Sequence, residues 1–199
     1  MLNIRESFRE IRQYMNIAEV GEIARRYFIM NALDGALTVL GVIMGAYAAG
    51  LPEPNLIVSA GLGASLAMGI SGAWGAYAAE DAERARSLKN LEKAMLTDLK
   101  KSIQYKASEF ASLWVAFIDG VSPAMAAIIV IIPFFFSRIA IISPESAVIA
   151  SITATITLLF ILGAYLGKIS KKNLVLQGFK MIAVGVVITI IFVLFRIMG

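Results

Sequence analysis

The sequence predicts an all-α integral membrane protein with five transmembrane helices. Hydrophobic residues make up 59% of the 199 residues. They gather in runs of about twenty or more, long enough to cross about 30 Å of hydrocarbon at about 1.5 Å per residue. Such runs are typical of a multi-pass membrane protein and not of a soluble domain. We expect the spans at residues 27–50, 56–79, 110–136, 147–167 and 174–195.

Residues 1–26 are expected to form an amphipathic segment ahead of the transmembrane domain, which covers residues 27–199. Its apolar residues recur at helical spacing, with charged residues on the opposite face: Ile4, Phe8, Ile11 and Met15. This pattern indicates a helix in the membrane interface or, equally well, a solvated helix packed on the cytoplasmic face of the protein itself. The charges leave no apolar core long enough for a secretory signal peptide.

The long hydrophilic connection covers residues 80–109. Its apolar residues also follow helical spacing: Leu88, Leu91, Met95, Leu99 and Ile103. We therefore expect the second span to continue into a cytoplasmic helix that leads back to the third. Glu80 lies where the second span leaves the membrane. It could concentrate cations there, or it could form a solvated pair with Arg84 on the helix face.

Two short loops carry turn and helix-start signals. Leu51-Pro52-Glu53-Pro54-Asn55 is rich in residues that form tight turns. Ser143 is placed to cap the fourth span, with Pro144 at the first helical position.

The positions of Lys and Arg predict the orientation of the chain. They concentrate before the first span, between the second and third, and between the fourth and fifth, whereas only Arg138 and Arg196 lie on the other side. Since cytoplasmic segments carry the positive excess, we expect a cytoplasmic N-terminus and a C-terminus on the opposite side. The net charge of +4 then reflects topology and attraction to anionic lipids, and nucleic-acid binding is not expected.

The chain contains neither cysteine nor histidine. This excludes disulfides, thiolate and imidazole metal ligands, and the Ser-His and Cys-His pairs of many enzymes. We expect no enzyme activity and no resident cofactor, since the sequence offers no convincing Ser-Lys pair either. An ion site must use carboxylates, amides, hydroxyls, carbonyls or Met thioethers. Oxygen donors suit Mg²⁺, Ca²⁺ or Mn²⁺, and a thioether moves the preference toward later transition metals.

Two aspartates interrupt the predicted spans. Asp34 lies in the first and Asp119 in the third, and each is followed by glycine, which suggests that the first two helices are echoed by the next two. A carboxylate at that depth costs about 3 kcal/mol to insert, so a membrane protein that keeps one tends to use it. A purely structural Asp34 would need a buried partner. For Asp119 a structural role is also open, because a helix kink at Pro123 would give nearby polar groups a local role in the backbone.

The residues around Asp34 form a candidate metal-binding face. Thr38 lies one turn after Asp34, Met30 one turn before it, and Asn31 beside them. On the second span, Met68 is the one large, soft side chain on a face of small residues. We expect this face to pack against another helix, in the same chain or in a second subunit. The alternatives are that methionine fills the core and that threonine bonds the carbonyl one turn back.

These motifs resemble those of the vacuolar iron transporter family, proton-coupled divalent-metal exporters with five transmembrane helices that work as homodimers. Asp34-Gly35-Ala36-Leu37-Thr38 resembles the first-helix motif Asp-Gly-x-x-Thr of that family. Leu159-Phe160-Ile161-Leu162-Gly163-Ala164 is similar to its fourth helix. The resemblance implies that Asp34 is a metal ligand in a transport path at the dimer interface.

The chain departs from the family pattern on the second helix, which typically reads Ser-Met-x-x-Gly-Glu-Tyr. Alignment on Gly75 and Tyr77 places Gly72 where the family has Met and Ala76 where it has Glu. Met68 lies one turn earlier, and it can replace the missing Met only if the helix is shifted or the site is rearranged. Residues 80–109 also lack the Glu-rich cytoplasmic metal-binding domain of the plant transporters.

We expect a homodimeric transporter that exports a divalent cation, Fe²⁺ or Mn²⁺, from the cytoplasm in exchange for protons. Asp34 would bind the metal when ionised and release it on protonation, and Asp119 would be a second ligand or a proton carrier. A passive cation channel and a non-transporting membrane scaffold are the alternatives. The candidate metal-contacting residues are Asp34, Met68, Asn31, Thr38, Asp119 and Glu80.

Overall fold

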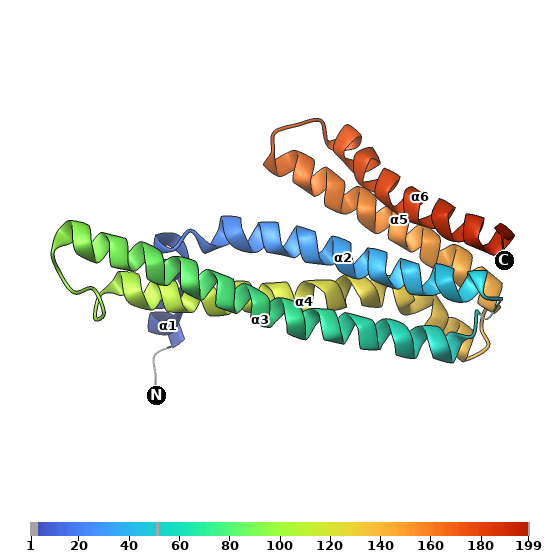
Figure 1. Cartoon of the computed structure of the whole chain (residues 1–199), viewed down its shortest axis with the longest axis horizontal. Helices are drawn as coiled ribbons and strands as arrows, with labels where there is room; N and C mark the ends of the chain where they lie inside the picture. The colour runs from blue at the N-terminus through green and yellow to red at the C-terminus, as the bar shows by residue number, and fades with distance from the viewer. Residues whose placement is uncertain (1–3, 51, 199) are drawn as a thin grey trace. The chain divides into compact units, whose positions relative to one another are not determined.

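The computed structural model describes residues 4–50 and 52–198, and these residues form six α-helices and no strand (Figure 1). The helices are α1 (Ile4–Ile17), α2 (Val20–Ala48), α3 (Pro54–Met95), α4 (Ile103–Arg138), α5 (Pro144–Ile169) and α6 (Leu174–Met198). Five of them, α2 to α6, are long and apolar enough to cross a membrane. This confirms the five predicted spans and the all-α fold.

Three of the helices extend well beyond the predicted spans. Helix α2 begins at Val20, α3 runs as one helix of 42 residues to Met95, and α4 begins at Ile103. Most of the hydrophilic connection is therefore helical, as its apolar spacing predicts. Hydropathy marks only the part of a helix that matches the hydrocarbon, so it underestimates helices that continue past it.

The amphipathic helix is shorter than residues 1–26. It ends at Ile17, because Glu19 adopts a left-handed backbone conformation with φ of 49°, and α2 then begins at Val20. On the predicted apolar face, Ile11 is 38% exposed. The side chains of Ile4 and Phe8 lie outside the described residues, as does Leu51 of the predicted turn.

The start of α5 forms as predicted. Ser143 has an extended backbone, with φ of −71° and ψ of 155°, and its side-chain oxygen accepts a hydrogen bond from the Ser146 amide at 3.2 Å. Pro144 occupies the first turn, where its missing N–H costs no helical hydrogen bond. This helix start depends on adjacent residues alone, which is why the sequence predicts it.

The chain forms two compact units, and each is described by itself. Unit 1 contains Met1–Phe28 and Ile70–Val121, and unit 2 contains Ile29–Gly69 and Ser122–Gly199. Unit 1 therefore holds α1, the start of α2 and the adjoining parts of α3 and α4. Its core is formed mostly by small side chains: Val20, Ala24, Ala76, Ala111 and Val115. Small residues let helix backbones approach closely.

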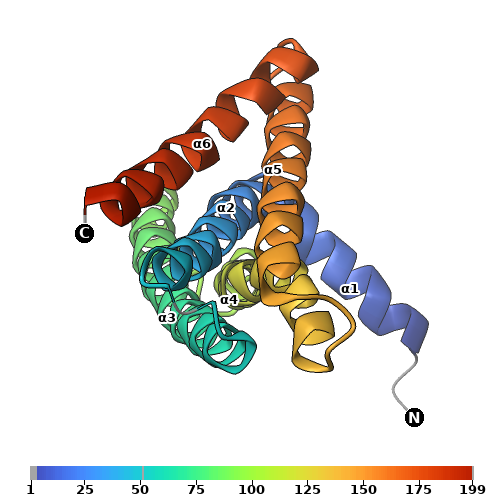
Figure 2. The same ribbon diagram turned by 90° about the vertical axis from the view of Figure 1, so that its right-hand side faces the viewer.

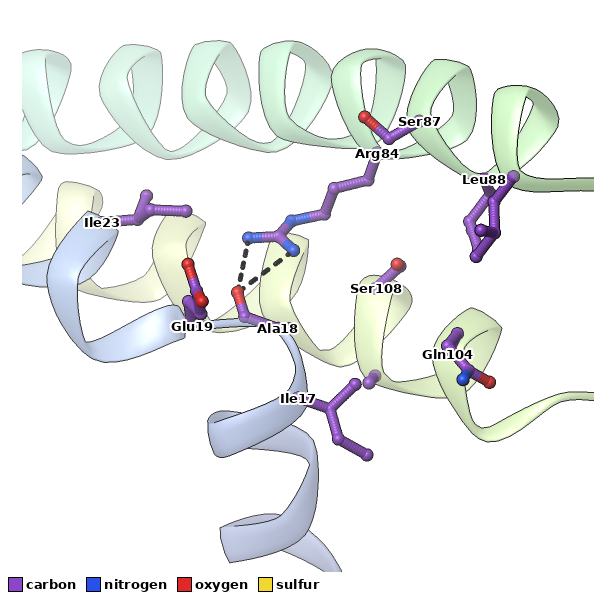
Figure 3. A pocket seen from close by; sticks show the side chains of 11 residues that line it. Ile17, Ala18, Glu19, Ile23, Arg84, Ser87, Leu88, Gln104 and Ser108 are labelled. Carbon is purple, nitrogen blue, oxygen red and sulfur yellow. Dashed lines mark hydrogen bonds between the residues drawn. The ribbon is translucent and has the colours of Figure 1, made fainter. Parts of the chain in front are cut away.

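Arg84 ties the α1–α2 junction to α3 within unit 1. Its terminal nitrogens donate to the Ala18 carbonyl at 3.4 and 3.5 Å (Figure 3). Its Nε donates to Glu80 Oε2 at 3.2 Å. The Arg84 and Glu80 side chains are only 14% and 12% exposed. The pair on the helix face thus forms, and it is largely shielded from solvent and not fully solvated. A ring contact between Tyr14 and Phe110, 6.0 Å between centroids, also joins α1 to α4.

Unit 2 contains the α5–α6 hairpin, whose two helices are drawn in orange and red in Figure 2 and meet at the loop that connects them. Gly163 of α5 faces the backbone of α6, since a Cβ added there would lie 2.5 Å from the Gln177 carbonyl oxygen. The Phe160 and Phe179 rings meet edge to face at 5.7 Å. The largest fully buried side chains of unit 2 include Leu40, Ile43, Met44, Ile57, Ile131, Phe134 and Leu159.

We predict that Arg84→Met loosens the α1–α2 junction. The substitution removes the donors to the Ala18 carbonyl and leaves the shielded Glu80 carboxylate without its cation. Limited trypsin digestion of the detergent-solubilised protein should cut the segment before α2 about fivefold faster, the effect of losing about 1 kcal/mol of local stability.

Arg86→Met is the matched control for this prediction, because Arg86 is exposed on the same helix. It removes the same type of side chain and the same charge. Equal cleavage rates in the two variants would show that Arg84 does not hold the junction.

Candidate metal-binding site

The described residues contain no group of three or more Asp, Glu, His or Cys side chains that could enclose a metal ion. A metal site in this part of the chain must therefore combine one or two carboxylates with neutral donors. Hydroxyls, amides and the Met thioether are the neutral donors that the sequence supplies. Such a site would hold its ion less tightly than a cluster of charged ligands, which suits an ion that must be released.

Asp34 is exposed on the surface of α2 in unit 2. The next residue, Gly35, is buried against α4, and a Cβ added to it would overlap the carbonyl oxygen of Pro123. Successive residues of an α-helix point in directions about 100° apart. The close approach of Gly35 to α4 therefore leaves the Asp34 carboxylate on the accessible side of α2. Met30, one turn earlier, is 56% exposed.

The structure brings Thr38 and Met68 together within unit 2. The Thr38 hydroxyl donates to the Met68 sulfur at 3.5 Å, and both side chains are half-buried. This contact joins α2 to α3 one turn after Asp34. Asn31 is half-buried on α2, one turn before Gly35. Four of the predicted site residues thus lie in unit 2, and two of them touch.

Asp119 lies in unit 1 and is only 3% exposed. It packs against Gly72 of α3, where an added Cβ would lie 2.5 Å from its Oδ2 atom. The carboxylate thus occupies the space beside Gly72. Ala76, one turn further along α3, is buried in the small-residue core of unit 1. Pro123 carries no N–H and so cannot donate the usual helical hydrogen bond to the Asp119 carbonyl.

Tyr27 and Glu80 interact within unit 1. The Tyr27 side chain hydrogen-bonds to Glu80 and lies within electrostatic reach of Asp119. Because Glu80 also pairs with Arg84, its carboxylate already has two polar partners. Sequence reasoning did not find Tyr27. Tyr27 lies far from Glu80 along the chain, so no sequence pattern predicts their contact. Arg84, in contrast, lies at the i,i+4 spacing that predicts a helical ion pair with Glu80.

A pocket of about 290 Å³ opens beside the α1–α2 junction in unit 1 (Figure 3). Arg84, Ser87, Gln104 and Ser108 supply most of its polar lining, and Glu19 is its single carboxylate. None of the predicted metal-contacting residues lines it. One carboxylate beside a guanidinium is a poor cation site, so the pocket is distinct from the candidate metal-binding residues.

The sequence model of the VIT family matches residues 25–113, which include Asp34, Thr38 and Met68. The uncharacterized protein MJ0645 of Methanocaldococcus jannaschii is 37% identical over 194 residues, covering 96% of each chain. The similarity to this relative thus extends through α5 and most of α6, beyond the segment that the family model matches.

We predict that Gly72→Ala destabilises the protein by about 1–3 kcal/mol, the usual cost of overpacking a filled site. The new methyl group would collide with the Asp119 carboxylate. In the double variant with Asp119→Ala the collision is absent, so the two effects on thermal unfolding should be clearly non-additive.

Gly75→Ala serves as the control for this cycle. Gly75 lies on the same helix, and an added Cβ would meet nothing within 4 Å. A loss of stability at Gly75 as large as that at Gly72, or additive effects at Gly72 and Asp119, would contradict the packing described above.

Proposed function

Since the chain belongs to the VIT family, we propose that it exports a divalent cation, Fe²⁺ or Mn²⁺, from the cytoplasm in exchange for protons. The family and the five apolar helices establish a multi-pass membrane protein related to metal-ion transporters. The metal, the exchange with protons and the direction of transport belong to the proposal.

The placement of Asp34 carries this proposal. It is an exposed carboxylate in the apolar part of α2, in the Asp-Gly-x-x-Thr motif, and Gly35 is the residue that packs inward. Thr38 lies on the same face and contacts the Met68 sulfur. A carboxylate on α2, a hydroxyl one turn after it and the α3 thioether that this hydroxyl contacts form a mixed donor set suited to Mn²⁺ and Fe²⁺.

Competition for the Asp34 carboxylate would couple the metal to protons. The ionised carboxylate binds the cation, and protonation removes the negative charge that holds it. A proton gradient can therefore drive metal release without a histidine. Asp119, buried in unit 1, is the second acidic group available along the spans, as a further ligand or as a proton carrier.

We further propose that the transporter is a homodimer in which a second subunit covers Asp34. A carboxylate exposed on an apolar helix would otherwise face lipid, which is costly. The second spanning helix also leaves small residues exposed that would allow close approach of another helix, among them Ser59, Ala60, Gly63 and Ala67. The dimer would thus enclose the path that the ion follows.

We predict that Asp34→Asn abolishes metal transport driven by a pH gradient. The amide keeps the shape of the side chain and loses the charge that attracts the cation. In proteoliposomes, uptake of Fe²⁺ or Mn²⁺ should fall by about tenfold or more, which corresponds to about 1.4 kcal/mol.

Asp98→Asn is the control for the same assay, because Asp98 is an exposed aspartate in the loop between α3 and α4. It should transport like the wild type. Wild-type flux that ignores the pH gradient would indicate a passive channel. An absence of flux for both metals, with the protein correctly inserted, would favour a membrane scaffold.

A further inference from the structure

The hydrogen bond between Thr38 and Met68 is unusual within this chain. Five threonines lie in the described helices, and four of them donate to the carbonyl one turn back: Thr153, Thr155, Thr157 and Thr189. That bond is the common choice for a threonine inside a helix. Thr38 instead donates across to the Met68 sulfur on α3. Its hydroxyl is therefore directed by a contact between helices and not by its own backbone.

This bond restrains a side chain that is otherwise flexible. Methionine has three rotatable side-chain bonds, and its thioether sulfur adapts readily to its surroundings. A hydroxyl donor at 3.5 Å uses one lone pair of the Met68 sulfur and leaves the other available. Four residues along α2, a rise of about 6 Å, separate Thr38 from Asp34. The restrained sulfur therefore contacts α2 one turn after the exposed carboxylate.

Met68 is a methionine of α3 whose sulfur contacts α2. It lies in unit 2 together with Asp34 and Thr38. One turn further along α3, at Gly72, the Asp119 carboxylate fills the space instead. A flexible thioether must be held in place to act as a soft ligand. Thr38 is the residue that makes the holding contact.

We propose that Thr38 is a positioning residue that holds the Met68 thioether as a soft ligand and so sets the preference among divalent metals. The site then favours Fe²⁺ and Co²⁺ over Mn²⁺ by more than an all-oxygen site would, because the thioether is a soft donor. This inference rests on the proposed function for its biological meaning. The metal preference itself can be measured as binding, without transport.

The test measures equilibrium binding of Co²⁺ and Mn²⁺ to the full-length protein in detergent. The measured quantity is the ratio of the two dissociation constants, Mn²⁺ over Co²⁺. Met68→Leu, which removes the sulfur, should lower this ratio. Thr38→Val keeps the shape and removes the hydroxyl, and it should lower the ratio by about fivefold, the usual effect of one lost hydrogen bond.

Two further variants separate positioning from general packing. Thr38→Ser keeps the donor and should keep the ratio within about twofold of the wild type. The double variant Thr38→Val with Met68→Leu should match Met68→Leu alone, because a threonine that acts through the sulfur has no effect once the sulfur is gone.

Several results would overturn the inference. One is that the wild type binds neither metal. Another is that Met68→Leu leaves the ratio of the Mn²⁺ and Co²⁺ dissociation constants unchanged. A third is that Thr38→Val weakens both metals equally, as a purely structural residue would. A fourth is that the effects of Thr38→Val and Met68→Leu on the ratio add fully. If the expected ratios are found but proteoliposomes show no metal flux, the positioning role stands and the proposed transport is wrong.

Discussion

The contact between Gly35 and the Pro123 backbone is the constraint on which the arrangement of α2 depends. No side chain fits at position 35, so the two helices approach as closely as their backbones allow. The direction of Gly35 determines the direction of its neighbours, because residues of a helix share one rigid frame. Asp34 is consequently presented on the accessible side, and Thr38, one turn on, reaches Met68 on α3. One glycine thus places both the charged and the neutral donors of the candidate site.

The three candidate carboxylates, Asp34, Glu80 and Asp119, have different surroundings and therefore different chemistry. Glu80 is shielded and paired with Arg84, and an ion pair of this kind holds elements together more readily than it binds a passing cation. Asp119 is buried in the room that Gly72 leaves. Asp34 is exposed and has an uncharged hydroxyl and thioether nearby. Only the last arrangement leaves a charged ligand accessible from outside the single chain.

A site of this composition fits an ion that must be bound and then released. The chain contains no cysteine or histidine, and its described part contains no cluster of three acidic side chains. In the proposed site, one carboxylate would supply the charge that attracts the cation, and neutral donors would refine the choice of metal. The same carboxylate would exchange its cation for a proton, since both compete for the same oxygens.

The sequence by itself determined the five spans, the extension of α3 and the cap at Ser143, because these depend on the length of apolar runs, helical spacing and neighbouring residues. It also marked Asp34, Thr38 and Met68 through their residue types and spacing. Only the tertiary structure decided what these residues contact. Three contacts join segments that lie far apart in the chain: Arg84 with the Ala18 carbonyl, Thr38 with Met68, and Asp119 with Gly72. Such contacts depend on how closely helices pack, and no local pattern of residues records that distance.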